Sequence, residues 1–227
     1  MLNAIDKDRI AAAVAKAEDA TSGEIRVALA GEVSKYREIP LAWAAAIALA
    51  APPIVLALSL QPLAGLVNDL WVVGQMGALE SELSVGLSLY AVIQIALFLV
   101  VLGVVHVPAV RRSLTPRVLK RHRVMAAAHH QFVSMGASAA AEETWVLIFV
   151  ALDDRQVQIL ADAGIHQKCG EAPWEAAAAA VAAAMKAGHD PTAGIIEAVG
   201  ICGAALAQHY PATGPHAAGP ADRPIEV

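Results

Sequence analysis

The stretch WVLIFVALDDRQVQILADAGI, residues 145–165, decides the fold that we expect for this chain. Its first part, Trp145–Ala151, is wholly apolar and rich in β-branched and aromatic residues, which is typical of a strand buried on both faces. The turn formers Asp153, Asp154 and Arg155 follow, and polar and apolar residues then alternate over residues 156–160, as in a strand with one face in water. The stretch therefore predicts a β-hairpin in an α/β domain.

Two long apolar runs precede this hairpin. Residues 39–68 and residues 83–110 contain no Asp, Glu, Lys or Arg. Because about 20 apolar residues in a helix cross the hydrocarbon of a bilayer, residues 41–60 and residues 83–110 are predicted to form two transmembrane helices. Pro52 and Pro53 should kink the first. A hydrophobic fraction of 57% and a charged fraction of 16% agree with membrane spans.

The charges that flank the two runs predict an orientation. The loop between them carries acidic charges only, at Asp69, Glu80 and Glu82. A basic run follows the second span, consisting of Arg111, Arg112, Arg117, Lys120, Arg121 and Arg123. The positive-inside rule places this run in the cytoplasm, which makes the chain a multi-pass inner-membrane protein with both termini cytoplasmic. The basic run either binds anionic lipid head groups as well or sets the topology alone.

The membrane hairpin interrupts a single domain. Glu24–Ala30 alternates polar and apolar residues and needs a partner strand, which we expect to be Trp145–Ala151, running parallel to it. Residues 1–38 and 111–210 then form a split cytoplasmic domain, residues 39–110 the transmembrane hairpin with its short acidic outer loop, and residues 211–227 a flexible tail rich in Pro, Ala and Gly. A helix from Pro191 to about Tyr210 is predicted to pack in the domain, because it contains Glu197 and is short for a span.

Carboxylates supply the candidate chemistry. The expected topology gathers Glu24, Glu142, Glu143 and Asp162 at one end of the sheet, either as oxygen ligands for calcium or magnesium or as a solvated rim. Asp153 and Asp154 lie at the other end, either as an acid/base pair or as ordinary turn residues. The sequence holds no dinucleotide, Walker or nucleophile-elbow motif, and nothing in it indicates nucleic acid.

Two segments resemble those of a known family. TSGEIRV (residues 21–27), after an amphipathic helix, and VLIFVALDDRQVQILADAGI (residues 146–165) are similar to the opening and the most characteristic block of the TPM domain, or TPM phosphatase, family. The chain looks closest to its bacterial branch with an inserted two-helix membrane hairpin. The resemblance implies a three-layer α/β/α sandwich with a small mixed sheet, and acid phosphatase activity or calcium binding in some relatives.

The implied acidic residues map to Asp162, Asp153, Asp154 and, less closely, Glu24, although Ala163 and Gly164 replace a glycine-rich turn. Two functions follow as expectations. The first is a membrane-anchored cytoplasmic module that binds another membrane protein or the lipid surface; the second is a divalent-metal-assisted acid phosphatase.

Overall fold

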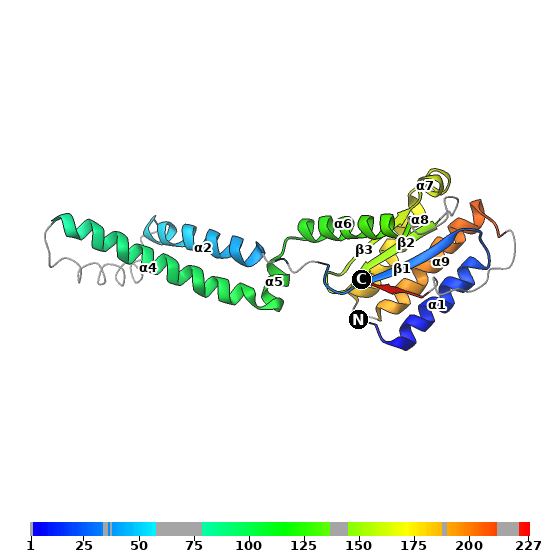
Figure 1. Ribbon diagram of the computed structural model, residues 1–227, viewed down its shortest axis with the longest axis horizontal. Coiled ribbons are helices and arrows are strands. Elements are labelled where there is room, and N and C mark those ends of the chain that lie inside the picture. The colour runs from blue at the N-terminus through cyan, green and yellow to red at the C-terminus, as the bar shows by residue number, and fades with distance from the viewer. Residues whose placement is uncertain are drawn as a thin grey trace. The chain divides into compact units, whose positions relative to one another are not determined.

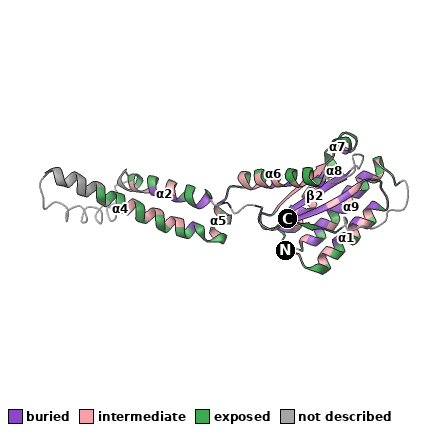
Figure 2. Cartoon of the chain, viewed as in Figure 1, coloured by how far each residue is buried: buried purple, intermediate pink, exposed green. Residues whose placement is uncertain are grey.

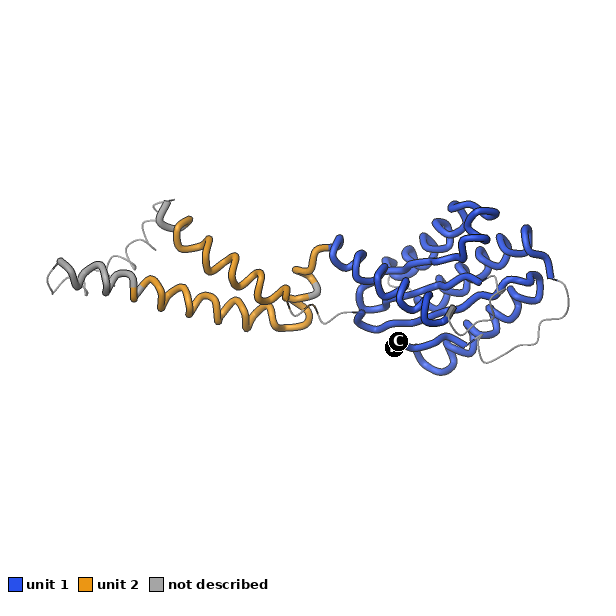
Figure 3. Tube along the Cα trace, turned by 45° about the horizontal axis from the view of Figure 1, so that its top comes forward, with its two compact units in different colours: residues 1–34, 117–227 blue, residues 35–116 orange. Residues whose placement is uncertain are grey.

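The computed structural model describes residues 2–33, 36, 38–57, 79–136, 145–187, 190–212 and 223–227. The chain folds as two compact units, coloured separately in Figure 3. Unit 1 consists of Met1–Ser34 and Arg117–Val227, and unit 2 is Lys35–Pro116. Asp69 of the predicted acidic loop, and Glu142 and Glu143, lie outside the residues whose placement is described. Glu80 and Glu82 do not belong to a loop, because a helix already begins at Leu79.

Unit 1 is a mixed α/β fold built on a four-stranded sheet in the order β3-β2-β1-β4 (Figure 1). β1 (Glu24–Ala30) pairs in parallel with β2 (Trp145–Ala151), so that Glu24 lies opposite Trp145 and Ala30 opposite Ala151. β3 (Gln156–Ala161) returns antiparallel to β2. The structure confirms the predicted central hairpin and the parallel pairing of strands from the two halves of the unit.

The end of the chain corrects the prediction of a flexible tail. Residues 213–222 lie outside the described part, but Ile225–Glu226 forms β4, parallel to β1 at the edge of the sheet. The Val227 backbone N–H donates to the Leu29 carbonyl at 3.0 Å, and Lys7 pairs with Glu226 at 2.7 Å. The composition of the tail favours disorder, but the unpaired edge of β1 offers backbone hydrogen bonds to the last residues of the chain. These hydrogen bonds order the end of the tail.

Helices cover both faces of the sheet. On one face lie α1 (Ala4–Glu18), α7 (Ala163–Cys169), α8 (Ala172–Lys186) and α9 (Pro191–His209). α6 (Arg117–Gly136) covers the other. Alternate residues of β2 point to opposite faces, so that Ile148 packs with the first group and Phe149 with α6. Every residue of β2 is buried, as the continuous apolar run predicts (Figure 2).

Glycines let α9 approach its neighbours. A Cβ added at Gly194 would lie 2.6 Å from the Ala184 Cβ, and one at Gly203 would lie 2.7 Å from the Ala17 Cβ. α9 therefore packs backbone-close against α8 and α1, where no larger residue fits. The prediction that α9 is a packed helix is confirmed.

Unit 2 covers the segment that the sequence predicts to be a membrane hairpin. Its helices are α2 (Glu38–Ala57), α4 (Leu79–His106) and the short α5 (Pro108–Leu114), and α2 packs against α4. The Trp43 Nε1–H donates to the Leu114 carbonyl at 3.3 Å, which joins α2 to α5.

By length and apolar composition, the described helices of unit 2 are not identified as membrane spans. Among the described residues, one helix is long and apolar enough to cross a bilayer, and it is α9, the core helix of unit 1. The apolar segments described for unit 2, Glu38–Ile54 and Tyr90–His106, are shorter, and residues 58–60 of the first predicted span lie outside the described residues. The two-span hairpin therefore stays a prediction.

Candidate functional site

The acidic residues predicted as a site occupy the two ends of the sheet. We call the end that holds the β2–β3 turn the turn end and the opposite one, where β1 and β2 begin, the cap end. Glu24 and Asp162 lie at the cap end, since both flank Trp145, whereas Asp153 and Asp154 lie at the turn end. The whole length of β2 separates the two pairs, so the four carboxylates do not form one site.

Each pair has local contacts that account for its position. The Asp162 carboxylate caps α7 by accepting from the Gly164 backbone N–H at 3.3 Å. Glu24 accepts from Arg26 Nε at 2.7 Å and from Arg26 Nη2 at 3.0 Å, a forked ion pair that neutralises the carboxylate. Both interactions are alternatives to metal binding.

The turn-end residues Asp153 and Asp154 join the β2–β3 turn to the segment that follows β1. Asp154 is 6% exposed and accepts from the Val33 backbone N–H at 3.4 Å, while Asp153 is exposed and its backbone N–H donates to the Gly31 carbonyl. These contacts support the interpretation of Asp153 and Asp154 as turn residues. Within the described part of the chain, no three His, Cys, Asp or Glu side chains gather in a manner that could hold a metal ion.

The basic run divides between the two units. Arg111 and Arg112 belong to α5 in unit 2, whereas Arg117, Lys120, Arg121 and Arg123 belong to the first turns of α6 in unit 1. Arg117 and Arg121 are exposed, and Lys120 and Arg123 are half-buried. The first turns of α6 therefore carry a cluster of positive charge.

Unit 1 has a groove of about 640 Å³ along the edge strand β3, which no part of the sequence argument anticipated. Its floor is β3 itself, and its walls are α6, through Arg121 and Met125, and α8. Three alanines (Ala178, Ala179 and Ala182) and Trp174 line the α8 side. Small side chains on that wall keep the space beside the strand open.

The charged side chains of the groove separate by sign along β3. Arg155 directly precedes β3, and Arg121 lies at the same end, because Phe132, further along α6, stacks on Trp145 at the cap end with ring centroids 4.1 Å apart. Glu171 and Glu175 lie at the cap end, where α8 begins after α7.

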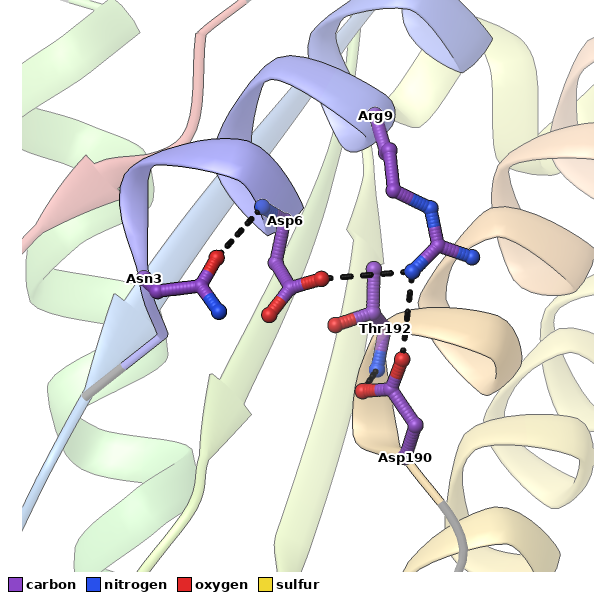
Figure 4. A network of polar contacts seen from close by, with 5 residues as sticks. All are labelled: Asn3, Asp6, Arg9, Asp190 and Thr192. Carbon is purple, nitrogen blue, oxygen red and sulfur yellow. Dashed lines mark hydrogen bonds and ion pairs between the residues drawn. The ribbon is translucent and has the colours of Figure 1, made fainter.

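Lys186 completes the basic end. It closes α8 shortly before Asp190, and Asp190 pairs with Arg9 at 3.3 Å, which brings the start of α9 to the start of α1 (Figure 4). α1 runs antiparallel to β1, so its start lies near the turn end of the sheet. Arg121, Arg155 and Lys186 are all exposed, and none of the ion pairs found among the described residues involves them.

Asp190 itself has a structural role. Its carboxylate caps α9 by accepting from the Thr192 backbone N–H at 2.9 Å, and it lies beside Arg9, which also pairs with Asp6 (Figure 4). The hydrogen bonds with Thr192 and, to a lesser degree, the Arg9 charge lower the pKa of Asp190 below its ordinary value. The network ties α1 to α9 and involves none of the groove charges.

The chain matches no family model and no curated protein sequence. It is similar to a solved structure, the NMR structure of the BA42 protein from the psychrophilic bacterium Bizionia argentinensis. The TM-score is 0.53 and the identity 17%, over 100% of this chain and 96% of that chain. The likeness is one of fold. It agrees with a mixed α/β architecture around a small sheet and carries no information on activity.

The groove residues could not be found by inspecting motifs. Arg155 and Lys186 are far apart in the sequence and have no spacing that indicates a common site. One signal was available: residues 156–160 alternate like a strand with one wet face, and no further strand is apparent after them to cover it.

Proposed function

We propose that the chain is a membrane-anchored binding module, in which the helices of unit 2 lie in a lipid bilayer and unit 1 acts in the cytoplasm on another membrane protein or on the lipid surface. The proposal includes a TPM-like, three-layer arrangement for unit 1, which is supported by helices on both faces of its sheet.

The observation that carries the proposal is the exposure of apolar side chains on unit 2. Leu49 on α2 is 64% exposed and Val100 on α4 is 63% exposed. They belong to a larger set on these two helices, namely Leu41, Trp43, Ile54, Tyr90, Val92, Ile95, Leu99 and Val104. Water penalises such a surface by roughly 25 cal/mol for each Å² of apolar area left exposed, whereas hydrocarbon does not.

The basic cluster fits the same arrangement. Arg117 and Arg121 begin α6 directly after unit 2 ends at Pro116. At a cytoplasmic surface rich in anionic lipid, each such residue contributes about 1 kcal/mol of attraction. Lipid binding and the setting of topology are then two consequences of one charge pattern.

The alternative function, a metal-assisted phosphatase, has less geometric support. Two-carboxylate metal chemistry needs its ligands around one point, and the four candidate carboxylates lie at two ends of a strand. Glu24 and Asp162 also have competing partners in Arg26 and the start of α7. The binding module is therefore the function that we propose first.

Fractionation of cells that express the full chain tests the proposal. We expect the protein to stay in the membrane pellet after extraction with alkaline carbonate, and a tag on its C-terminus to resist protease in intact spheroplasts but not in lysed ones. Release by carbonate, or digestion of the tag from outside, would contradict it. The detergent-purified protein, assayed on a generic phosphate ester with calcium or magnesium, tests the alternative: turnover lost in both Asp162→Ala and Asp153→Ala would favour the enzyme.

A further inference from the structure

One side of β3 has an open row of backbone hydrogen-bonding groups. β3 is at the edge of the sheet and pairs with β2 alone in the described part of the chain. The Asp162 N–H donates to the Trp145 carbonyl at 3.2 Å, which makes Asp162 a hydrogen-bonded position opposite β2. In an antiparallel ladder such positions alternate, so the backbone groups of Val157, Ile159 and Ala161 point away from β2, into the groove.

Trp174 forms part of the groove wall. Its side chain is 6% exposed, and its Nε1 is buried without a hydrogen-bond acceptor among the described residues. A buried indole N–H without an acceptor costs about 1–3 kcal/mol. The ring offers an occupant a rigid apolar surface beside the strand.

The separation of charge along the groove favours one direction for a bound peptide relative to β3. An extended peptide that runs antiparallel to β3 brings its carboxyl end to Arg121, Arg155 and Lys186, and its amino end to Glu171 and Glu175. A parallel peptide would place both of its ends beside like charges, which is destabilising.

We propose that the groove binds the C-terminal segment of a partner polypeptide as an added strand, antiparallel to β3, with its terminal carboxylate held by Arg121, Arg155 and Lys186. This deepens, and rests on, the proposed binding function. The added strand supplies main-chain hydrogen bonds to β3, and the walls formed by α6 and by the alanines of α8 accept its alternate side chains.

A single strand fits this edge better than a second copy of unit 1. α6 and α8 form walls on the two sides of β3. A second sheet joining here would bring its own α6 and α8 against the first pair, whereas a lone peptide brings no helices. β1, the strand on the other side of β2, already shows the binding mode, because the chain's own C-terminal strand β4 lies against it with Val227 bonded to Leu29.

The test uses the full chain in lipid nanodiscs and a fluorescent peptide as long as β3, with alternating valine and threonine, a lysine at the amino end and a glutamate at the free carboxyl end. We expect saturable binding by anisotropy. The same peptide with its terminal glutamate replaced by an amidated lysine, so that both of its ends are basic, should bind at least about tenfold more weakly. Equal binding of the two peptides would overturn the proposed capture of the carboxylate.

Amide hydrogen exchange tests the pairing itself. On peptide binding, we expect slower exchange at Val157, Ile159 and Ala161, whose N–H groups face the groove. Gln158 and Leu160 provide an internal control, because their N–H groups already face β2. Protection at β4 or β1 without protection at β3 would contradict the assigned edge.

Three substitutions separate binding from folding. Arg155 has a φ of 50°, a left-handed conformation that glycine adopts freely, so Arg155→Gly should weaken the peptide about tenfold without lowering stability. Ala179→Trp should block the groove, whereas Ala183→Trp, exposed on the same helix but outside the groove, should not. If Arg155→Gly and Ala179→Trp both bind as the unchanged protein does, the groove is not the site.

The outcomes distinguish this proposal from the function on which it rests. Absence of binding up to about 1 mM peptide, with the protein still resistant to carbonate extraction, would reject the peptide site and leave the membrane module standing. Loss of carbonate resistance would reject the membrane module. If the protein forms dimers and the Ala179→Trp variant is monomeric, a second copy occupies this edge of the sheet and the proposal is overturned.

Discussion

The two units use the same apolar residue types in opposite ways. In unit 1, Ile148 and Phe149 are buried between helices on the two faces of a sheet, and the large apolar residues of α9 point inward. In unit 2, Leu49 and Val100 point outward from two helices that pack on each other. Composition alone therefore does not separate a core from a membrane surface; the difference lies in whether the fold provides a second layer to cover the side chains.

α9 illustrates the difference. By length and composition it is the helix most similar to a membrane span among the described residues, yet Gly194 and Gly203 bring it into backbone contact with α8 and α1. The side of α9 that stays exposed carries small and polar residues, such as Glu197, Ala204 and Gln208, and not large apolar side chains. The exposed faces of α2 and α4, in contrast, carry large apolar side chains.

The largest expected effect is on the stability of unit 1, and it tests the burial of the core of that unit. Phe149→Ala removes a side chain that is 1% exposed and should lower the free energy of unfolding of unit 1 by about 3–5 kcal/mol, through lost transfer energy and a cavity. Val92→Ala on α4, where the side chain is exposed, should leave this free energy within about 0.5 kcal/mol. Denaturant unfolding of the detergent-solubilised protein measures both; equal effects would contradict the assignment of the two environments.

The next largest effect is expected when a charge is introduced on an exposed face of each unit and membrane fractionation is compared. Val100→Lys introduces an ammonium into the proposed lipid-facing surface, at a cost of about 2.5–3.5 kcal/mol for a central position, and should reduce the carbonate-resistant fraction. Val133→Lys on α6 is the matched control, since Val133 is 68% exposed in unit 1. If both variants fractionate like the unchanged protein, α4 does not contact lipid.

The smallest effect concerns the polar network that closes unit 1. Asp190→Ala removes the cap of α9 and should destabilise unit 1 by about 1 kcal/mol, whereas Asp190→Asn keeps a capping oxygen and should cost less. Because the pKa of Asp190 is lowered in the folded protein, its contribution is complete above the ordinary value of 3.8 and is lost as the pH falls through the folded-state pKa. Unfolding curves between neutral and acidic pH should therefore converge for the unchanged protein and Asp190→Ala; curves that stay parallel would exclude the charged cap.

The thiols offer an independent check of the core. Burial raises the pKa of Cys202 to about 12, while Cys169 is half-buried and its pKa is raised by burial against a smaller opposing effect of Lys168. Near neutral pH, a thiol reagent should modify Cys169 first and Cys202 only when unit 1 unfolds. Equal labelling rates in the native protein would show that α9 is not packed as described.

The sequence was informative where the structure depends on local pattern. The apolar run of β2, the turn at Asp153 and the alternation of β3 predict the hairpin, and the isolated strand at Glu24 predicts the parallel pairing with β2. These features follow from strand periodicity and from the instability of a lone strand. The resemblance to the TPM family remains a prediction.

What depends on tertiary proximity could not be predicted. β4 is two residues long and has no periodicity of its own, so its order comes from the open edge of β1. Asp162 was predicted as a ligand, and its local role as a helix cap is set by where α7 begins. The groove joins α6, β3 and α8, which no single stretch of sequence reveals.

The central claim is that unit 2 faces lipid and unit 1 faces water. Nitroxide labels placed on single cysteines at positions 100 and 133, in a background with Cys169 and Cys202 replaced by serine and alanine, test it in vesicles by electron paramagnetic resonance. The account predicts that the label at position 100 collides with oxygen and is shielded from a water-soluble nickel chelate, and that the label at position 133 shows the reverse. Equal access of nickel to both labels would contradict it.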